Sequence, residues 1–200
     1  ADYLTQSFAD FAAVQATKIL EDSIADTEQA ARNKGWNTAI NPCILTAADG
    51  KSAGTAVGSR THIASRRSFA EECSDRMVKA RFQIKHFGAV CKGGIQFGSC
   101  YLHCNWDQNR SFNLDLLQTI GAMLGTLRGP WIIGGDWQCP PDELRNTGWL
   151  KTVKGVIYSP KAATCGDRVL DYFVVSEDLA QASAIVAACT IGDADFGPHS

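Results

Sequence analysis

The order of secondary-structure patterns between residues 82 and 136 constrains the fold most strongly. Two strand-like segments, "RFQIKHFGAV" and "GIQFGSCYLHCNW", flank "CKGG", whose paired glycines favour a hairpin turn. Apolar residues then recur at helical spacing from Ser111, a plausible N-cap, until Gly129-Pro130 ends the helix. Residues 131–134 return to a strand. A hairpin, a helix and another strand predict a mixed α/β chain: a layered sandwich with helices packed outside.

Weaker patterns extend this expectation to the segments before residue 82 and after residue 136. Residues 8–19 suggest a short helix running into a strand, although periodicity alone does not decide. "DTEQAARNKGW" predicts a helix with Asp26 as N-cap and Gly35 at its end. Residues 43–65 suggest strands and turns, whereas residues 66–81 fit no pattern. "PPDEL" predicts a turn or short helix, and "RVLDYFVVS" predicts a strand followed by a helix capped by Ser176.

Size and composition are those of an ordinary globular chain. The 200 residues are 45% hydrophobic and 20% charged, which suffices for one domain spanning residues 1–200. No stretch approaches the ~18 apolar residues that a membrane span requires. The net charge of −2 gives no global field that favours nucleic acid. The arginines between Arg60 and Arg81 suggest a solvated segment more strongly than a phosphate track.

Eight cysteines are scattered along the chain without a C-x-x-C pair, which argues against zinc. We interpret them as reduced side chains, which favours a reducing intracellular compartment over a disulfide framework. The chain begins with Ala1 and lacks a signal-peptide layout, so earlier removal of an organelle-targeting segment stays open.

Two acids and a histidine occupy unusual places. Asp136 follows the apolar run "WIIGG", Asp171 lies inside "RVLDYF", and His199 lies in "DFGPHS". A carboxylate at a buried strand end needs a hydrogen bond, an ion pair or a cation. If neighbouring strands carry these residues, they could bind a divalent ion and activate water against a phosphate. Each residue by itself is more often a satisfied structural group.

The motifs "PWIIGGDWQ", "DRVLDYFVVSEDL" and "PHS", in that order, resemble the endonuclease/exonuclease/phosphatase superfamily. The chain is most similar to its exonuclease III-like and retroelement apurinic-type endonucleases. "FAAVQATK" stands where that family has its "LQET" strand, and "SCYLHCNWDQN" where it has a strand-borne tyrosine. The resemblance extends from about Phe8 to Ser200. It implies a four-layered α/β sandwich of two packed mixed sheets flanked by helices, and cleavage of phosphate esters with magnesium.

The resemblance also implies roles for individual residues. Asp136 would handle the proton of the attacking water or of the leaving group and, in an active enzyme, would contact the metal. Asp171 would orient His199, which would stabilise the phosphate, and Tyr101 would contact that phosphate. Gln138 stands where the family has an asparagine.

The departures from the family pattern bear directly on activity. Ala16 replaces the main metal-binding glutamate, and a methyl group cannot bind magnesium, which requires oxygen ligands. Pro198 replaces the aspartate before the terminal histidine. Two pairs of acids, Glu21 with Asp22 and Asp193 with Asp195, could compensate only through rearrangement. The family's first strand is missing and Ser200 follows the last motif directly, so we expect a piece truncated at both ends.

Three functions are compatible with these residues. The favoured one is a catalytically inactive descendant that has no cofactor and serves as a structural or docking subunit of a protein assembly. The second is an active magnesium-dependent phosphodiesterase or endonuclease with a rearranged site. The third, weakly supported by the arginines, is a nucleic-acid-binding module without cleavage.

Overall fold

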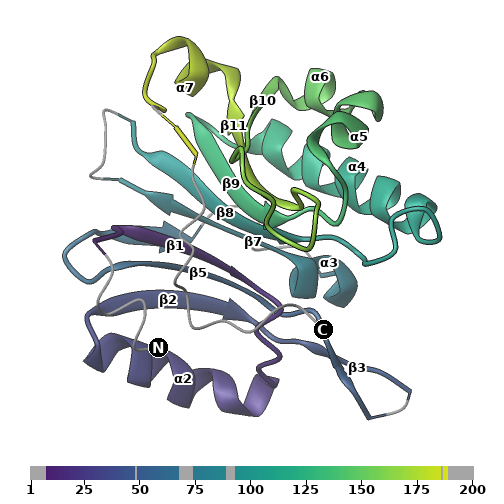
Figure 1. Ribbon diagram of the computed structural model, residues 1–200. Coiled ribbons are helices and arrows are strands. Elements are labelled where there is room, and N and C mark those ends of the chain that lie inside the picture. Colours follow the sequence, from purple (N-terminus) through teal and green to yellow (C-terminus); the bar gives the residue numbers. More distant parts are fainter. Residues whose placement is uncertain (1–7, 48, 68–73, 89–92, 186, 189–200) are drawn as a thin grey trace.

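Two β-sheets stack face to face in the structure, a computed structural model that describes residues 8–47, 49–67, 74–88, 93–185 and 187–188. Figure 1 shows helix α2 on the outer face of the smaller sheet, and helices α4, α5 and α6 on the outer face of the larger sheet. The order of layers is therefore helix, sheet, sheet, helices. The four-layered mixed α/β sandwich predicted from the sequence is confirmed.

The larger sheet has six strands in the order β10-β11-β9-β8-β7-β6. Its central neighbours β8 and β9 are parallel, and its other neighbours are antiparallel. The strands are β6 (Ser65–Arg67), β7 (Phe82–Phe87), β8 (Ile95–Tyr101), β9 (Trp131–Asp136), β10 (Gly155–Tyr158) and β11 (Asp171–Ser176). The predicted hairpin is confirmed as β7 and β8.

The smaller sheet has three antiparallel strands in the order β1-β5-β2. These strands are β1 (Phe11–Gln15), β2 (Trp36–Asn41) and β5 (Thr55–Arg60). Between β2 and β5 in the sequence, β3 (Ile44–Leu45) and β4 (Lys51–Ser52) form a separate two-stranded arm that extends beyond the sheets in Figure 1.

Helices are present in the three segments where the sequence predicts them most clearly, and α3 and α6 are additional. The helices are η1 (Glu21–Ser23), α2 (Ile24–Asn33), α3 (Arg76–Arg81), α4 (Arg110–Thr126), α5 (Pro141–Asn146), α6 (Trp149–Val153) and α7 (Glu177–Gln181). Gly35 adopts a φ of 83° just after α2, as expected for a glycine that ends a helix.

Three sequence expectations are wrong in detail. The strand expected within residues 8–19 is present at residues 11–15, but residues 8–10 form no helix before it. The N-cap position of α2 is Ser23 instead of Asp26, and that of α4 is Asn109 instead of Ser111, although neither side chain makes a cap bond. Ser176 is the N-cap residue of α7, as expected, but its hydroxyl accepts a hydrogen bond from the Trp131 backbone N–H at 3.2 Å and makes no cap bond. Tertiary contacts thus override local capping preference at this position.

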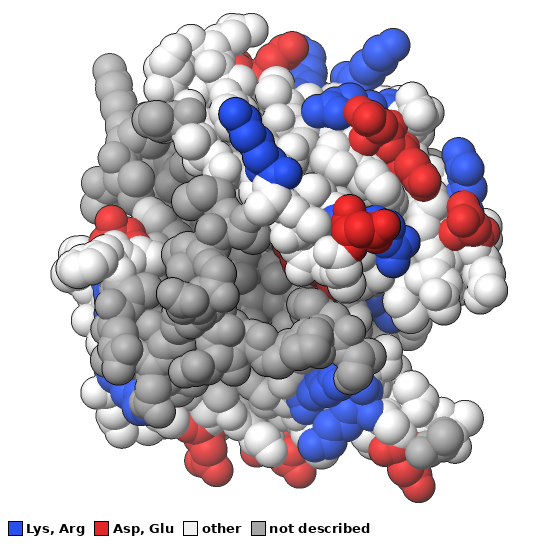
Figure 2. Space-filling view, viewed as in Figure 1, with Lys and Arg blue, Asp and Glu red and all other residues white. Residues whose placement is uncertain are grey.

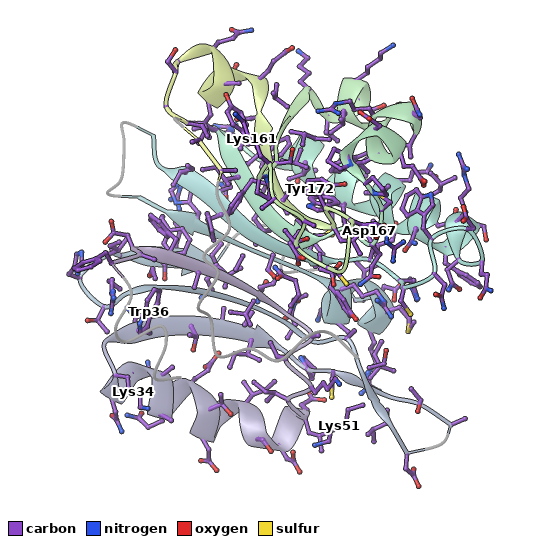
Figure 3. All side chains as sticks on the ribbon, viewed as in Figure 1. Lys34, Trp36, Lys51, Lys161, Asp167 and Tyr172 are labelled. Atoms are coloured by element: carbon purple, nitrogen blue, oxygen red, sulfur yellow. The ribbon has the colours of Figure 1, made fainter. Side chains whose placement is uncertain are left out.

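Two apolar layers hold the sandwich together. One lies between the six-stranded sheet and its helices and includes Leu117, Ile120, Ile133 and Val174. Tyr172, labelled in Figure 3, belongs to this layer. The other lies between the two sheets and contains residues Val57, Phe87, Ile95 and Phe97. Because side chains of a strand alternate between faces, each central strand supplies residues to both layers.

The layer between the sheets changes from apolar to polar along its length. At one end the Phe11 ring lies 5.3 Å from that of Phe97. Towards the other end, Gln15 donates through Nε2 to the Ser99 hydroxyl at 2.9 Å, and Ser99 donates to the Val14 carbonyl. A buried polar group needs such partners to offset lost hydration. The polar end of this layer contains the candidate site.

Candidate functional site

Tyr101, Asp136 and Asp171 form one row across three adjacent strands. In the parallel β8–β9 ladder Tyr101 pairs with Asp136, and in the antiparallel β9–β11 ladder Asp136 pairs with Asp171. Directly opposed residues of neighbouring strands have Cβ atoms roughly 4.5–5.5 Å apart. Three residues that are far apart in sequence therefore lie at one rim of the six-stranded sheet.

All three side chains of this row emerge on the same face of the sheet. Cys100 and Tyr172, the sequence neighbours of Tyr101 and Asp171, pack among the helices. Two residues before Asp136, Gly134 approaches Ala13 of the smaller sheet. Alternation thus directs the row towards the smaller sheet, at the polar end of the layer between the sheets.

The Asp136 carboxylate is buried, with only 3% of the residue exposed. Both of its oxygens accept hydrogen bonds from Gln138. The Gln138 backbone N–H donates to Oδ1 at 3.2 Å, and its side-chain Nε2 donates to Oδ2 at 2.7 Å. Hydrogen bonds to a carboxylate are stronger than those between neutral groups, so this pair stabilises Asp136 in its buried place.

Arg81 adds a buried cation next to the row. Its guanidinium lies 5.5 Å from the centre of the Tyr101 ring and donates through Nη1 to the carbonyls of Tyr101 and Leu102, at 3.3 and 3.2 Å. Only 5% of Arg81 is exposed, and burial lowers the pKa of its guanidinium. The expectation of a solvated arginine segment is therefore wrong for this residue.

The Tyr101 phenol keeps its proton more firmly than an exposed tyrosine. Burial raises the pKa of Tyr101, and the Asp136 carboxylate raises it further. The phenol therefore remains a neutral hydroxyl at physiological pH, able to donate a hydrogen bond at the rim.

The loop after β8 is fixed by one buried amide. Asn113, which is fully buried in α4, accepts from the His103 backbone N–H at 2.7 Å and donates to the His103 carbonyl at 3.1 Å. The His103 ring lies 5.9 Å from that of Phe112. Burial, with a contribution from the Arg81 charge, lowers the pKa of His103 to about 4, so its imidazole is neutral at pH 7.

Ala16 lies where β1 ends beside the rim. β1 and β8 run in the same direction, because Phe11 contacts Phe97 whereas Gln15 bonds Ser99 further along. Gln15 also donates to the Gly134 carbonyl at 3.2 Å, two residues before Asp136. Ala16 follows with a left-handed φ of 51°. Ala16, to which the sequence resemblance assigns the place of a glutamate, thus follows the strand that bonds to Gly134, and it carries only a methyl group.

Several residues singled out from the sequence lie elsewhere. His199, Pro198, Asp193 and Asp195 fall outside the described residues. Glu21 and Asp22 are exposed on η1, where the Glu21 carboxylate lies 3.9 Å from the Arg76 guanidinium. No described contact joins Glu21 or Asp22 to Asp136.

The described residues at this rim lack one oxygen ligand that the family resemblance implies for magnesium. Within the described ranges there is no group of three or more histidine, cysteine, aspartate or glutamate side chains that could hold a metal ion. Magnesium requires near-octahedral oxygen coordination, commonly with one or two carboxylates and a phosphate. Ala16 supplies no oxygen, and on one side each Asp136 oxygen faces an N–H group of Gln138. We therefore derive no chemical step through a metal.

Sequence reasoning missed two structural residues of this site. Arg81 belonged to a segment without a clear pattern, and its burial depends on contacts with β8 that no local signal reveals. Asn113 lies between apolar residues of an amphipathic helix, where a polar side chain on the buried face is a detectable signal.

The surface visible in Figure 2 carries charges of both signs. Figure 2 shows blue and red side chains interspersed over the described part of the visible face, without one sign dominating it. No helix within the described part of the chain has the length and apolar character needed to cross a membrane.

Comparison with known proteins gives structural matches only. No protein-family model and no curated protein sequence matches the chain. Three solved structures illustrate the similarity. A β-hairpin deletion mutant of beta toxin from Staphylococcus aureus is 13% identical, with a TM-score of 0.63 over 100% of this chain and 88% of that one. The AP endonuclease LMAP from Leishmania major is 15% identical, with a TM-score of 0.59 over 90% and 73%. An endonuclease/exonuclease/phosphatase family protein from Leptotrichia buccalis is 12% identical, with a TM-score of 0.53 over 86% and 78%.

Proposed function

The chain has the endonuclease/exonuclease/phosphatase (DNase I-like) fold, and we propose that it is a catalytically inactive member of this fold that serves as a structural or docking subunit. One observation carries this proposal. The rim brings together two carboxylates and a tyrosine, but the position at the end of β1 holds Ala16, which offers no oxygen to a metal.

The hydrogen bonds at the rim support the same proposal. A buried carboxylate without a cation requires protein donors, and Gln138 provides two of them to Asp136. The row thus has hydrogen bonds at Asp136 that do not depend on a metal. It therefore has a structural reason to persist after loss of catalysis.

Exposed apolar side chains support a docking role. Leu45 on β3 and Met77 on α3 are 58% and 47% exposed, on two elements that contact each other. Exposed apolar side chains that form a contiguous patch are typical of surfaces that bind other proteins, and we propose that Leu45 and Met77 belong to such a patch. We propose protein partners, and a reducing compartment that keeps exposed Cys104 as a thiol.

The test is a cleavage assay with a matched variant. The purified chain and Asp136→Asn are incubated with magnesium or manganese and with duplex DNA containing an abasic site or a nick. We expect both proteins to give the same background as a vehicle control. Metal-dependent cleavage by the unmodified chain that Asp136→Asn abolishes would refute the proposal, whereas cleavage shared by both proteins indicates a contaminating nuclease.

A second candidate, a metal-dependent phosphodiesterase with a rearranged site, is favoured by the alignment of Tyr101, Asp136 and Asp171 on one face. The solved structures of this fold include an enzyme described as an AP endonuclease. The same assay separates the candidates, because this one requires turnover that depends on Asp136.

A further inference from the structure

Gln138 adopts an unusual backbone conformation to reach Asp136. Its φ is 55°, in the left-handed region that a residue other than glycine, asparagine or aspartate seldom occupies. In this conformation its backbone N–H faces Oδ1 of Asp136 while its side-chain amide folds back to Oδ2. A strained conformation persists when surrounding contacts stabilise it. Here the two hydrogen bonds supply that stabilisation.

The donors of Gln138 present positive hydrogens to both carboxylate oxygens. The Nε2 to Oδ2 distance of 2.7 Å is at the short end for such bonds and leaves no room for an ion between the two atoms. A divalent cation approaching these oxygens from the same side would meet N–H dipoles oriented against it. On this side of the carboxylate the amide therefore occupies the place that a cation would need.

From this geometry we propose that the Gln138 side chain is a positioning residue that takes the place of a cation at Asp136. Two features then disfavour the binding of a divalent ion at the rim: position 16 carries no carboxylate, and the Gln138 amide occupies one side of Asp136. This inference rests on the proposed absence of a metal site and specifies a second reason for that absence. It predicts that restoring a carboxylate at position 16 is insufficient while the Gln138 amide is present.

Four variants test the two features separately. They are Ala16→Glu, Gln138→Met, the double variant Ala16→Glu/Gln138→Met, and the charge-matched control Ala30→Glu/Gln138→Met, in which the new carboxylate lies on the exposed face of α2. Methionine resembles glutamine in length and shape but has no N–H donor. Ala16 already has a left-handed φ, so glutamate adds no new backbone conformation there. The readout is the thermal unfolding midpoint in magnesium and in chelator.

We expect magnesium to raise the unfolding midpoint of the double variant only. At ligand concentrations about a hundred times Kd, a rise of about 5 °C or more is expected for a chain of this size. An Ala16→Glu variant that responds as strongly as the double variant would overturn the role of Gln138, and so would a folded double variant that does not respond. A response of the unmodified chain that Asp136→Asn removes would instead refute the proposed function itself.

A measurement on the unmodified chain keeps the inference testable if a variant does not fold. The side-chain NH₂ resonances of Gln138, assigned by NMR, report on its bond to Asp136. We expect one amide proton to exchange more slowly with solvent than those of exposed Gln108, and its resonance to stay unchanged when magnesium is added. Fast exchange, or a saturable shift with magnesium, would contradict the inference.

Discussion

The backbone of Asp171 pairs directly with that of Asp136 across the antiparallel β9–β11 ladder. The same residue, Asp136, pairs with Tyr101 on its other side. Two acids and a tyrosine thus share one rim and one face of the six-stranded sheet. Gln138 donates hydrogen bonds to both oxygens of Asp136 there.

Removing the Asp136 carboxylate should weaken the fold. In Asp136→Ala both donors of Gln138 lose their acceptor at a buried place, and we expect a loss of about 1–3 kcal/mol in the free energy of unfolding. Urea denaturation measures it. As a control, Asp142→Ala breaks only an exposed pair with Arg145 and should change stability by less than about 1 kcal/mol. Equal stability of Asp136→Ala and the unmodified chain would contradict this account of the rim.

Asn113 should contribute more to stability than the neighbouring Asn109. Asn113→Ala leaves the N–H and carbonyl of His103 without their amide partner, with an expected loss of about 1–3 kcal/mol. Asn109 makes a single side-chain bond, to the Cys104 carbonyl, so Asn109→Ala should lose less. Urea denaturation compares the two variants. Hydrogen exchange at the His103 amide should accelerate in Asn113→Ala only.

His103 should titrate far below an ordinary histidine. Burial lowers its pKa to about 4 in the folded chain, compared with about 6.5 in an unfolded one. Between these values the unfolded state binds the proton and the folded state does not, so stability is lost as pH falls from 6.5 towards 4. NMR titration of the imidazole measures the midpoint directly. His103→Gln should reduce the loss of stability over this pH range, and a midpoint above 6 would show that the ring is not desolvated.

Two glycine-to-alanine changes should have opposite effects on the free energy of unfolding. A Cβ at Gly135 would lie 2.9 Å from the Cys100 carbonyl oxygen, a backbone atom that cannot move away cheaply. We expect Gly135→Ala to destabilise by about 1–3 kcal/mol. Gly125, in helix α4, has open space around its Cβ position, so Gly125→Ala should stabilise by about 0.5–1 kcal/mol. Thermal unfolding of the two variants shows whether each change raises or lowers the unfolding midpoint. A shift of both midpoints in the same direction would contradict the packing described for β9.

The sequence predicts the layers but not the contacts that complete the site. In the structure, strand alternation separates Asp171 and Tyr101 from their neighbours Tyr172 and Cys100, which pack against the helices. The sequence also has an acid, Asp136, at the end of an apolar run, and in the structure this acid lies at the rim of the sheet. These signals are local, because the period of a strand determines which face each side chain joins.

The contacts that complete the site, one local and one between distant segments, leave no comparable signal. Nothing near Gln138 in the sequence indicates a left-handed backbone that folds the amide onto Asp136. Arg81 is buried where the carbonyls of Tyr101 and Leu102 accept its hydrogen bonds, about twenty residues further along the chain. The proposed roles of Tyr101, Asp171 and His199 stay predictions that variants at these positions must test.

Calorimetric titration of the unmodified chain with magnesium tests the central claim most directly. Since Ala16 supplies no oxygen and Gln138 engages both oxygens of Asp136, we expect no saturable heat at millimolar magnesium. Saturable binding that disappears in Asp136→Asn would show that the rim retains a metal site, and would contradict the account of a catalytically inactive fold.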